Sequence, residues 1–155
     1  MTIAILWPTF MLVGLIFAMW FWMFVKRFGH IKANPPGADD FANGDAAMRY
    51  FRPVEMPANN LRNLFEMPVL FFALMPLLLI FRHAGHVQVV LAWAYVLLRV
   101  LHSVAHINVR TSPIPRLIPY LLSCAVLLAM WIGFAVDMIS AQTAYDAAME
   151  NITAI

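Results

Sequence analysis

The sequence predicts an all-α integral membrane protein, built as a bundle of four helices. Hydrophobic residues make up 63% of the 155-residue chain and charged residues only 12%, and the mean hydropathy is +0.78. A soluble domain of this length carries far more charge. Four apolar runs, each close to the ~20 residues that cross ~30 Å of hydrocarbon, place helices at about 3–25, 59–82, 87–107 and 114–138. We treat residues 1–155 as a single membrane domain.

The first helix, residues 3–25, carries no charged side chain. Trp7, Trp20 and Trp22 stand near its ends, where aromatic residues mark the membrane surfaces. Because no basic segment precedes the apolar run and no small-residue cleavage site follows it, we expect a retained helix rather than a signal peptide.

The connection at 26–58 is long and rich in turn-forming residues between Asn34 and Asp45. We expect a short helix within it, near 46–51. Two interpretations stay open: a connector packed under the bundle, or a lid over a site that faces the cytoplasm.

The basic residues predict the orientation of the chain. The second connection contains only Arg82, and the C-terminal tail is acidic, whereas the first and third connections hold Lys26, Arg27, Lys32, Arg49, Arg52, Arg110 and Arg116. Lys and Arg concentrate on the cytoplasmic side of membrane proteins. We therefore expect loops one and three in the cytoplasm and both termini on the opposite side, in the inner membrane if the source is bacterial. The net charge of +2 is too small and scattered for nucleic-acid binding.

Three polar residues open the second helix. Asn59, Asn63 and Glu66 have the spacing i, i+4 and i+7, which predicts one shared helical face. A carboxylate facing hydrocarbon costs roughly 2–3 kcal/mol. The face must therefore turn toward protein or water, which makes it a candidate functional site.

A second polar face is predicted on the third helix, formed by Tyr95, Arg99, His102 and His106. Arg99 needs a counter-charge, and we predict an ion pair with Glu66, because their depths differ by only roughly 4–5 Å. His102 and His106 could chelate a metal together with Glu66, but polar packing or substrate contact is the favoured interpretation and no metal site is predicted.

Arg116 stands at the start of the fourth helix, with Tyr120 one turn further on. The first interpretation makes Arg116 a membrane anchor and Tyr120 an interfacial aromatic residue. The second has Arg116 stabilise an anion, such as a thiolate or a carboxylate. Cys124, the single cysteine, excludes an internal disulfide and is expected to be an inert buried thiol.

Taken together, the motifs NxxxNxxExP in the second helix, RxxHxxxH in the third and RLIPY in the fourth resemble the MAPEG family, the membrane-associated proteins in eicosanoid and glutathione metabolism. The resemblance covers nearly the whole chain and suggests a divergent, bacterial-type member. It implies a homotrimer of four-helix subunits that binds glutathione between neighbouring subunits, on the cytoplasmic side.

The resemblance also assigns residues. Asn63 and Glu66 would hold the polar backbone of glutathione, and Arg116 would match the arginine that activates its thiol. The remaining expected site residues are His102 as an acid or base, and Asn59, Arg62, Arg99, His106 and Tyr120 as binding residues. Two departures from the family pattern stand out: Asn59 occupies the place of an arginine, which Arg62 replaces only in part, and His102 and His106 occupy the places of tyrosines.

Three functions follow as hypotheses. The first is a glutathione-dependent transferase or peroxidase that acts on lipophilic electrophiles. The second is a non-catalytic trimeric scaffold or accessory subunit of a larger membrane complex, in which the polar residues hold helices together. The third is a site for a quinone, a lipid or a metal.

Overall fold

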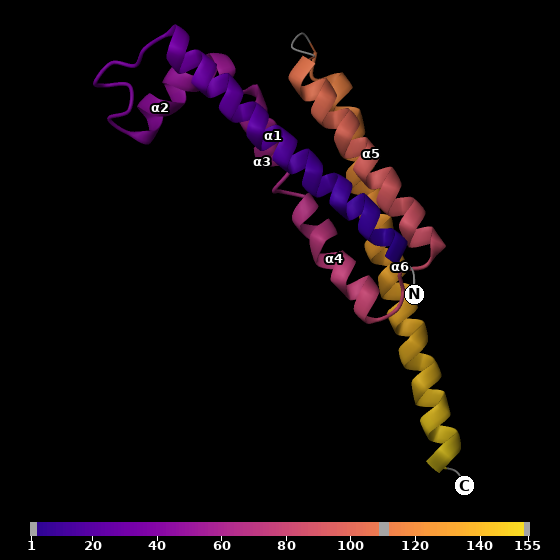
Figure 1. Ribbon diagram of the computed structural model, residues 1–155. Coiled ribbons are helices and arrows are strands. Elements are labelled where there is room, and N and C mark those ends of the chain that lie inside the picture. Colours follow the sequence, from indigo (N-terminus) through magenta and orange to yellow (C-terminus); the bar gives the residue numbers. More distant parts are fainter. Residues whose placement is uncertain (1–2, 109–111, 154–155) are drawn as a thin grey trace.

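The computed structural model describes residues 3–108 and 112–153, and within them four helical segments are long and apolar enough to cross a membrane (Figure 1). The segments are Ile3–Ala33, Met56–Ile80, His86–Asn108 and Ile114–Thr153. All regular structure in the described residues is helical, which confirms the predicted fold class. Its elements are η1 (Ile3–Ile5), α1 (Leu6–Ala33), α2 (Gly44–Phe51), η2 (Arg52–Val54), α3 (Met56–Asn63), α4 (Pro68–Ile80), α5 (His86–Asn108) and α6 (Ile114–Thr153).

The core lies where α1, α4, α5 and α6 meet, and α5 and α6 pack along much of their length. Phe71 of α4 stacks on Tyr95 of α5, with ring centroids 4.8 Å apart. The other fully buried apolar side chains include Leu12, Leu74, Leu78, Ala92, Val96 and Met130. Because lipid is as apolar as this core, close packing and internal hydrogen bonds, rather than exclusion of water, hold the spans together.

Helix α1 continues well past the predicted end at residue 25 and stops at Ala33, before the breaking sequence Asn34-Pro35-Pro36. The predicted short helix is present as α2, whose first turn is capped by Asn43: its side chain accepts a hydrogen bond of 2.9 Å from the Ala46 N–H. Arg27 of α1 lies over the Phe51 ring of α2, 4.8 Å from its centre. The first connection thus packs on the end of α1.

Tyr50 adds a second link between α2 and the end of α1. Its hydroxyl donates a hydrogen bond to the Asn34 carbonyl, and its ring meets that of His30 at 4.9 Å. Partial burial, and then the carboxylate of Asp40, raise the pKa of Tyr50 above its ordinary value. The phenol therefore keeps the proton that it donates.

The second span is not one helix but two, because α3 ends at Asn63 and α4 begins at Pro68. Proline has no N–H to donate to the carbonyl four residues earlier, and its ring crowds that turn. The prediction of a continuous helix over 59–82, with Glu66 on the same helical face as Asn63, is therefore wrong. Glu66 lies in the break.

Helix α6 also runs beyond its predicted end at 138 and projects from the bundle to Thr153 (Figure 1). The sequence of this extension contains neither glycine nor proline and is rich in alanine, the residue with the highest helix propensity. A hydrogen bond of 2.8 Å from Gln142 to Asp146 links successive turns.

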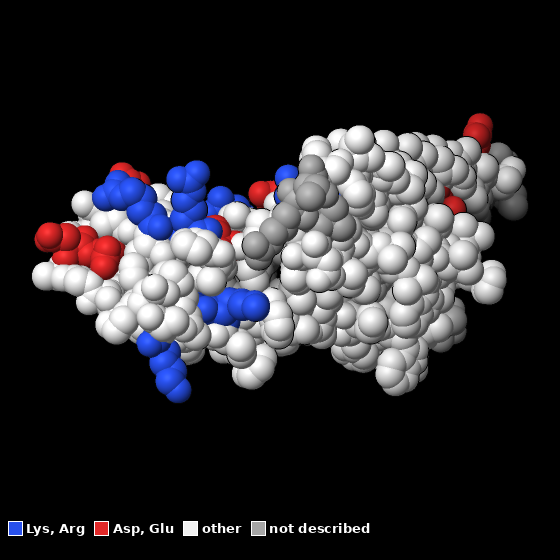
Figure 2. Space-filling model, turned by 90° about the horizontal axis from the view of Figure 1, so that it is seen from above, with Lys and Arg blue, Asp and Glu red and all other residues white. Residues whose placement is uncertain are grey.

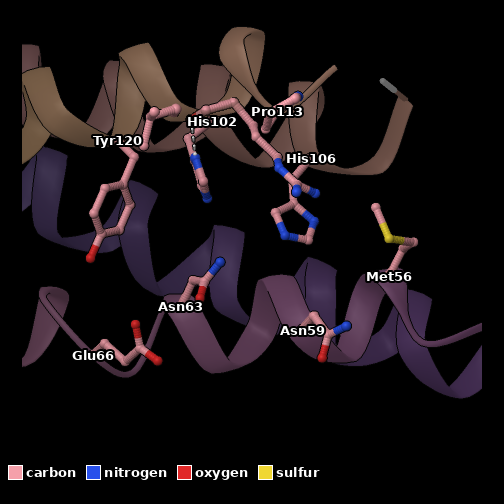
Figure 3. A pocket seen from close by; sticks show the side chains of 10 residues that line it. Met56, Asn59, Asn63, Glu66, His102, His106, Pro113 and Tyr120 are labelled. Atoms are coloured by element: carbon pink, nitrogen blue, oxygen red, sulfur yellow. Dashed lines mark hydrogen bonds between the residues drawn. The ribbon is translucent and has the colours of Figure 1, made fainter. Parts of the chain in front are cut away.

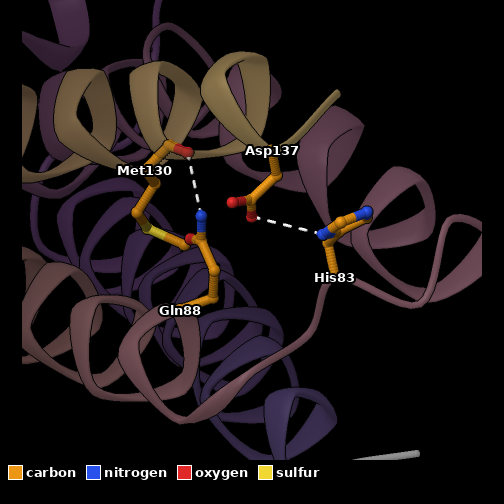
Figure 4. Close-up of polar contacts among 4 residues, drawn as sticks. All are labelled: His83, Gln88, Met130 and Asp137. Atoms are coloured by element: carbon orange, nitrogen blue, oxygen red, sulfur yellow. Dashed lines mark hydrogen bonds and ion pairs between the residues drawn. The ribbon is translucent and has the colours of Figure 1, made fainter. Parts of the chain in front are cut away.

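The end of the bundle near both termini is tied together by polar side chains (Figure 4). His83, in the turn between α4 and α5, forms an ion pair of 3.3 Å with Asp137 of α6. Gln88 of α5 donates a hydrogen bond of 3.1 Å to the Met130 carbonyl. His83 is thus an interfacial residue with a specific partner.

Charged side chains gather at the opposite end, over α2 and the end of α1, while most of the remaining visible surface is uncharged (Figure 2). Large apolar residues such as Phe17 and Phe21 of α1 and Leu121 and Leu128 of α6 are exposed, as expected for lipid contact. Arg110, which contributed to the predicted orientation, lies outside the described residues.

Candidate functional site

A cavity of about 460 Å³ lies between α3, the start of α6 and the end of α5. Figure 3 shows side chains from these elements pointing toward one another across it. The lining residues are Met56, Asn59, Asn63, Glu66, His102, His106, Pro113, Arg116, Leu117 and Tyr120. Within the connection predicted at 26–58, Met56 lines the cavity, and the structure places this residue at the start of α3.

One wall consists of amide and carboxylate groups. Asn59 and Asn63 are one turn apart on α3, and Glu66 follows in the break (Figure 3). Because the chain leaves the helical path after Asn63, the exposed carboxylate of Glu66 joins this wall. The predicted grouping of the three residues is found, although the break rather than a common helical face produces it.

The facing wall carries two histidines of α5, both more than 90% buried. The Nδ1 atom of His102 lies 2.7 Å from the Arg116 carbonyl oxygen. A carbonyl can only accept, so Nδ1 carries the hydrogen, and in the neutral ring Nε2 keeps its lone pair. This Nε2 is buried and has no hydrogen-bond partner among the residues that the structure describes, and the ring points toward Asn63 in Figure 3.

Arg116 and Tyr120 come from the first two turns of α6, and both are partly buried. Proline is tolerated in this first turn because the N–H groups there have no intrahelical acceptor. The start of α6 thereby brings a guanidinium and a phenol to the cavity. The interpretation of Arg116 as an anion-stabilising residue requires that its side chain reach a cavity, and it does.

The predicted ion pair between Glu66 and Arg99 is wrong. Arg99 is fully buried and does not line the cavity. Its Nη2 donates a hydrogen bond to the backbone carbonyl of Asn63, and its guanidinium lies 5.3 Å from the centre of the Tyr120 ring. Because α3 ends early, the partial negative charge of a helix C-terminus, rather than a carboxylate, is available to Arg99. The ion pair found among residues 3–108 and 112–153 joins His83 to Asp137.

The sequence-predicted residues thus divide into two groups. Neither Arg62, which is exposed, nor Arg99 lines the cavity, whereas those that do are Asn59, Asn63, Glu66, His102, His106, Arg116 and Tyr120. Sequence reasoning missed Met56, Pro113 and Leu117. Met56 stands three residues before Asn59, so the same helical spacing could have found it.

The two histidines of α5 lie close together in the cavity wall. In the described part of the chain, no group of three His, Cys, Asp or Glu residues could hold a metal ion. The rings of His102 and His106 lie 5.6 Å apart, and the His102 ring also lies 5.4 Å from that of Tyr120.

A second, apolar groove of about 380 Å³ lies between α4 and α6. It follows the first cavity directly along the chain, since Met67 comes after Glu66 and Cys124 comes one turn after Tyr120. The other lining residues are Leu70, Leu127, Leu128 and Trp131. Cys124 is partly exposed to this groove, which corrects the expectation of a fully buried thiol.

Comparisons with known proteins agree with the motifs. Neither the curated proteins nor the solved structures include a match to the chain. The model of the MAPEG family matches residues 5–136, which contain the four spans up to the projecting part of α6. The chain therefore belongs to the MAPEG family.

Proposed function

We propose that the protein is a glutathione-dependent transferase or peroxidase that acts on lipophilic electrophiles and works as a homotrimer in the bilayer. One observation carries this proposal: a cavity lined by a guanidinium, two imidazoles, two side-chain amides and a carboxylate lies next to an apolar groove. The polar cavity suits the thiol substrate, and the groove suits an acceptor that enters from the membrane.

The lining residues fit a thiol tripeptide chemically. The amides of Asn59 and Asn63 can exchange hydrogen bonds with peptide groups, and the Glu66 carboxylate can pair with an ammonium group. Arg116 supplies the positive charge that favours a thiolate over a thiol. The buried lone pair on His102 Nε2 marks the place of a proton acceptor.

In the proposed reaction, glutathione supplies the reacting sulfur, and the protein supplies the proton acceptor and the positive charge. Bound glutathione supplies a thiolate that displaces a leaving group from carbon. With a hydroperoxide, the thiolate attacks the O–O bond and becomes a sulfenic acid while the alcohol is released, and a second glutathione then displaces water from that sulfur to give glutathione disulfide. His102 takes the thiol proton at Nε2. Arg116 stabilises the negative charge on sulfur, and Asn63 and Glu66 orient the peptide.

The test uses full-length protein in detergent. Calorimetry should detect the binding of glutathione, and an absorbance assay should detect its conjugation to chlorodinitrobenzene. S-methylglutathione, which has no free thiol, should inhibit the conjugation by competing with glutathione. If calorimetry detects no binding and neither conjugation nor hydroperoxide reduction occurs, the enzymatic proposal fails.

A second candidate is an accessory subunit of a larger membrane complex. It is favoured by the part of α6 after residue 136, which lies outside the family match, projects from the bundle and exposes Tyr145, Met149 and Ile152. Co-purification of a membrane partner that is lost when this extension is removed, without any glutathione signal, would support it.

A further inference from the structure

Arg99 is a buried cation that the proposed chemistry does not use. It lies on α5, is fully inaccessible, and does not line the cavity that holds the other polar residues. A cation inside a membrane bundle is rare and generally has a functional or structural partner. The two contacts of Arg99 explain its place.

The first contact replaces a backbone hydrogen bond that the second span has lost. Asn63 is the last residue of α3, so its carbonyl has no regular helical partner. The N–H groups around the break bond elsewhere: Phe65 donates to Arg62 at 2.9 Å and Val69 to Glu66 at 3.4 Å. Arg99 Nη2 donates to the Asn63 carbonyl and so caps the end of α3.

The second contact reaches the other wall of the cavity. The Arg99 guanidinium lies 5.3 Å from the centre of the Tyr120 ring on α6, within the range of a cation–π interaction. Asn63 and Tyr120 both line the cavity, from α3 and α6. One side chain on α5 therefore holds residues on two opposing walls.

We propose that Arg99 is a positioning residue for the thiol substrate. It fixes the interrupted end of α3 relative to the start of α6, and so sets the spacing between the Asn63–Glu66 wall and the Arg116–Tyr120 wall. Because the helix end and the aromatic ring balance its charge, the Glu66 carboxylate stays free for the ammonium group of a ligand. This inference rests on the proposed glutathione-dependent function.

The kinetic experiment compares Arg99→Met and Arg99→Lys with Arg52→Met, which removes an exposed arginine that does not line the cavity. For Arg99→Met we expect the KM for glutathione to rise about tenfold, equivalent to about 1.4 kcal/mol, while kcat at saturating glutathione changes less than KM. Arg99→Lys, which keeps a charged donor, should restore part of the affinity. An unchanged KM in Arg99→Met, or a loss confined to kcat, would overturn the proposal.

Hydrogen exchange gives a readout that needs no activity. Without ligand, the amides of residues 64–67 should exchange faster in Arg99→Met than in the wild type or in Arg52→Met, because the end of α3 has lost its cap. Equal exchange contradicts the capping role. If the wild type binds no glutathione but the exchange rates differ, the proposed function fails while the structural role of Arg99 stands. Should Arg99→Met not fold, Arg99→Lys and Arg99→Gln replace it, with the lysine variant expected closer to wild type.

A double-mutant cycle distinguishes this role from an ion pair. If Arg99 and Glu66 paired, the Glu66→Gln/Arg99→Met double variant would be less impaired than the sum of the single variants. We expect the effects of the two changes on thermal stability without glutathione to add, since Arg99 contacts the Asn63 carbonyl and the Tyr120 ring rather than the Glu66 carboxylate. Strong coupling would refute the assignment of Arg99 to the helix end.

Discussion

From the sequence alone, Arg116 can be interpreted either as a membrane anchor or as a functional residue that stabilises an anion. A cytoplasmic arginine next to an apolar run anchors many membrane helices. In the structure, however, its side chain lines a cavity, and its carbonyl accepts the His102 hydrogen bond. The two proposed catalytic residues are therefore linked through the backbone of α6.

Replacing Arg116 by alanine should lower kcat/KM for conjugation on the order of 10²-fold, because the thiolate loses its stabilising charge. The backbone carbonyl that orients His102 remains, and the side chain is only partly buried, so folding should be preserved. Thermal melting and initial rates in detergent check both points. Arg116→Lys is the matched control and should keep part of the activity.

His102→Gln should lower the rate at neutral pH on the order of 10²-fold, because a positioned base is lost. The deficit should shrink as pH rises past the pKa of a free thiol, about 8.5, since the substrate then ionises without help. The measurement is the ratio of variant to wild-type rate between pH 6.5 and 9.5. His86→Gln, at the other end of α5, serves as the control, and a ratio that does not change with pH would exclude a base role for His102.

At the scale of elements, the break between α3 and α4 shapes the site. It turns Glu66 toward the cavity and leaves the Asn63 carbonyl to Arg99. Proline in a helix interior costs about 3 kcal/mol, which is enough to favour a break at Pro68. The motif NxxxNxxExP thus combines binding residues with the feature that positions them.

Replacing Pro68 by alanine restores an N–H that can bond to the Leu64 carbonyl and lets α3 run into α4. We expect thermal stability to stay the same or rise, while the KM for glutathione increases severalfold because Glu66 leaves the cavity wall. Calorimetry and melting curves measure the two effects. Pro76→Ala, inside α4 and away from the cavity, should change the affinity little; equal losses in both variants would contradict a specific role for the break.

At the scale of the whole molecule, the distribution of charge predicts its orientation. The basic residues of the first connection lie around α2, and the projecting end of α6 carries Asp146 and Glu150. By the preference of Lys and Arg for the cytoplasmic side, α2 and the glutathione cavity should face the cytoplasm. In this orientation, the projecting part of α6 should lie on the opposite side of the membrane.

This orientation can be tested by labelling with a membrane-impermeant thiol reagent in a Cys124→Ser background. In intact cells, Ala147→Cys in the projecting helix should react, whereas Ala42→Cys before α2 should react only after permeabilisation, because the membrane separates them. The reverse pattern would place the cavity on the outside and exclude cytoplasmic glutathione as its ligand.

Much of the site could be read from local spacing. Asn59, Asn63, His102, His106, Arg116 and Tyr120 all line the cavity as expected, because residues three, four or seven apart share a helix face and polar faces turn away from lipid. The partners of charged residues could not be read in this way. The depth argument that paired Glu66 with Arg99 assumed a continuous second helix.

The sequence by itself determined the four spans and the polar faces of α5 and α3, because hydropathy and helical period are local properties of the chain. Only the tertiary structure decided which group neutralises Arg99, where the Glu66 carboxylate points, and that a polar cavity meets an apolar groove. These features depend on where α3 ends relative to α5 and α6. Contacts between elements distant in sequence set that relation, and no local pattern records it.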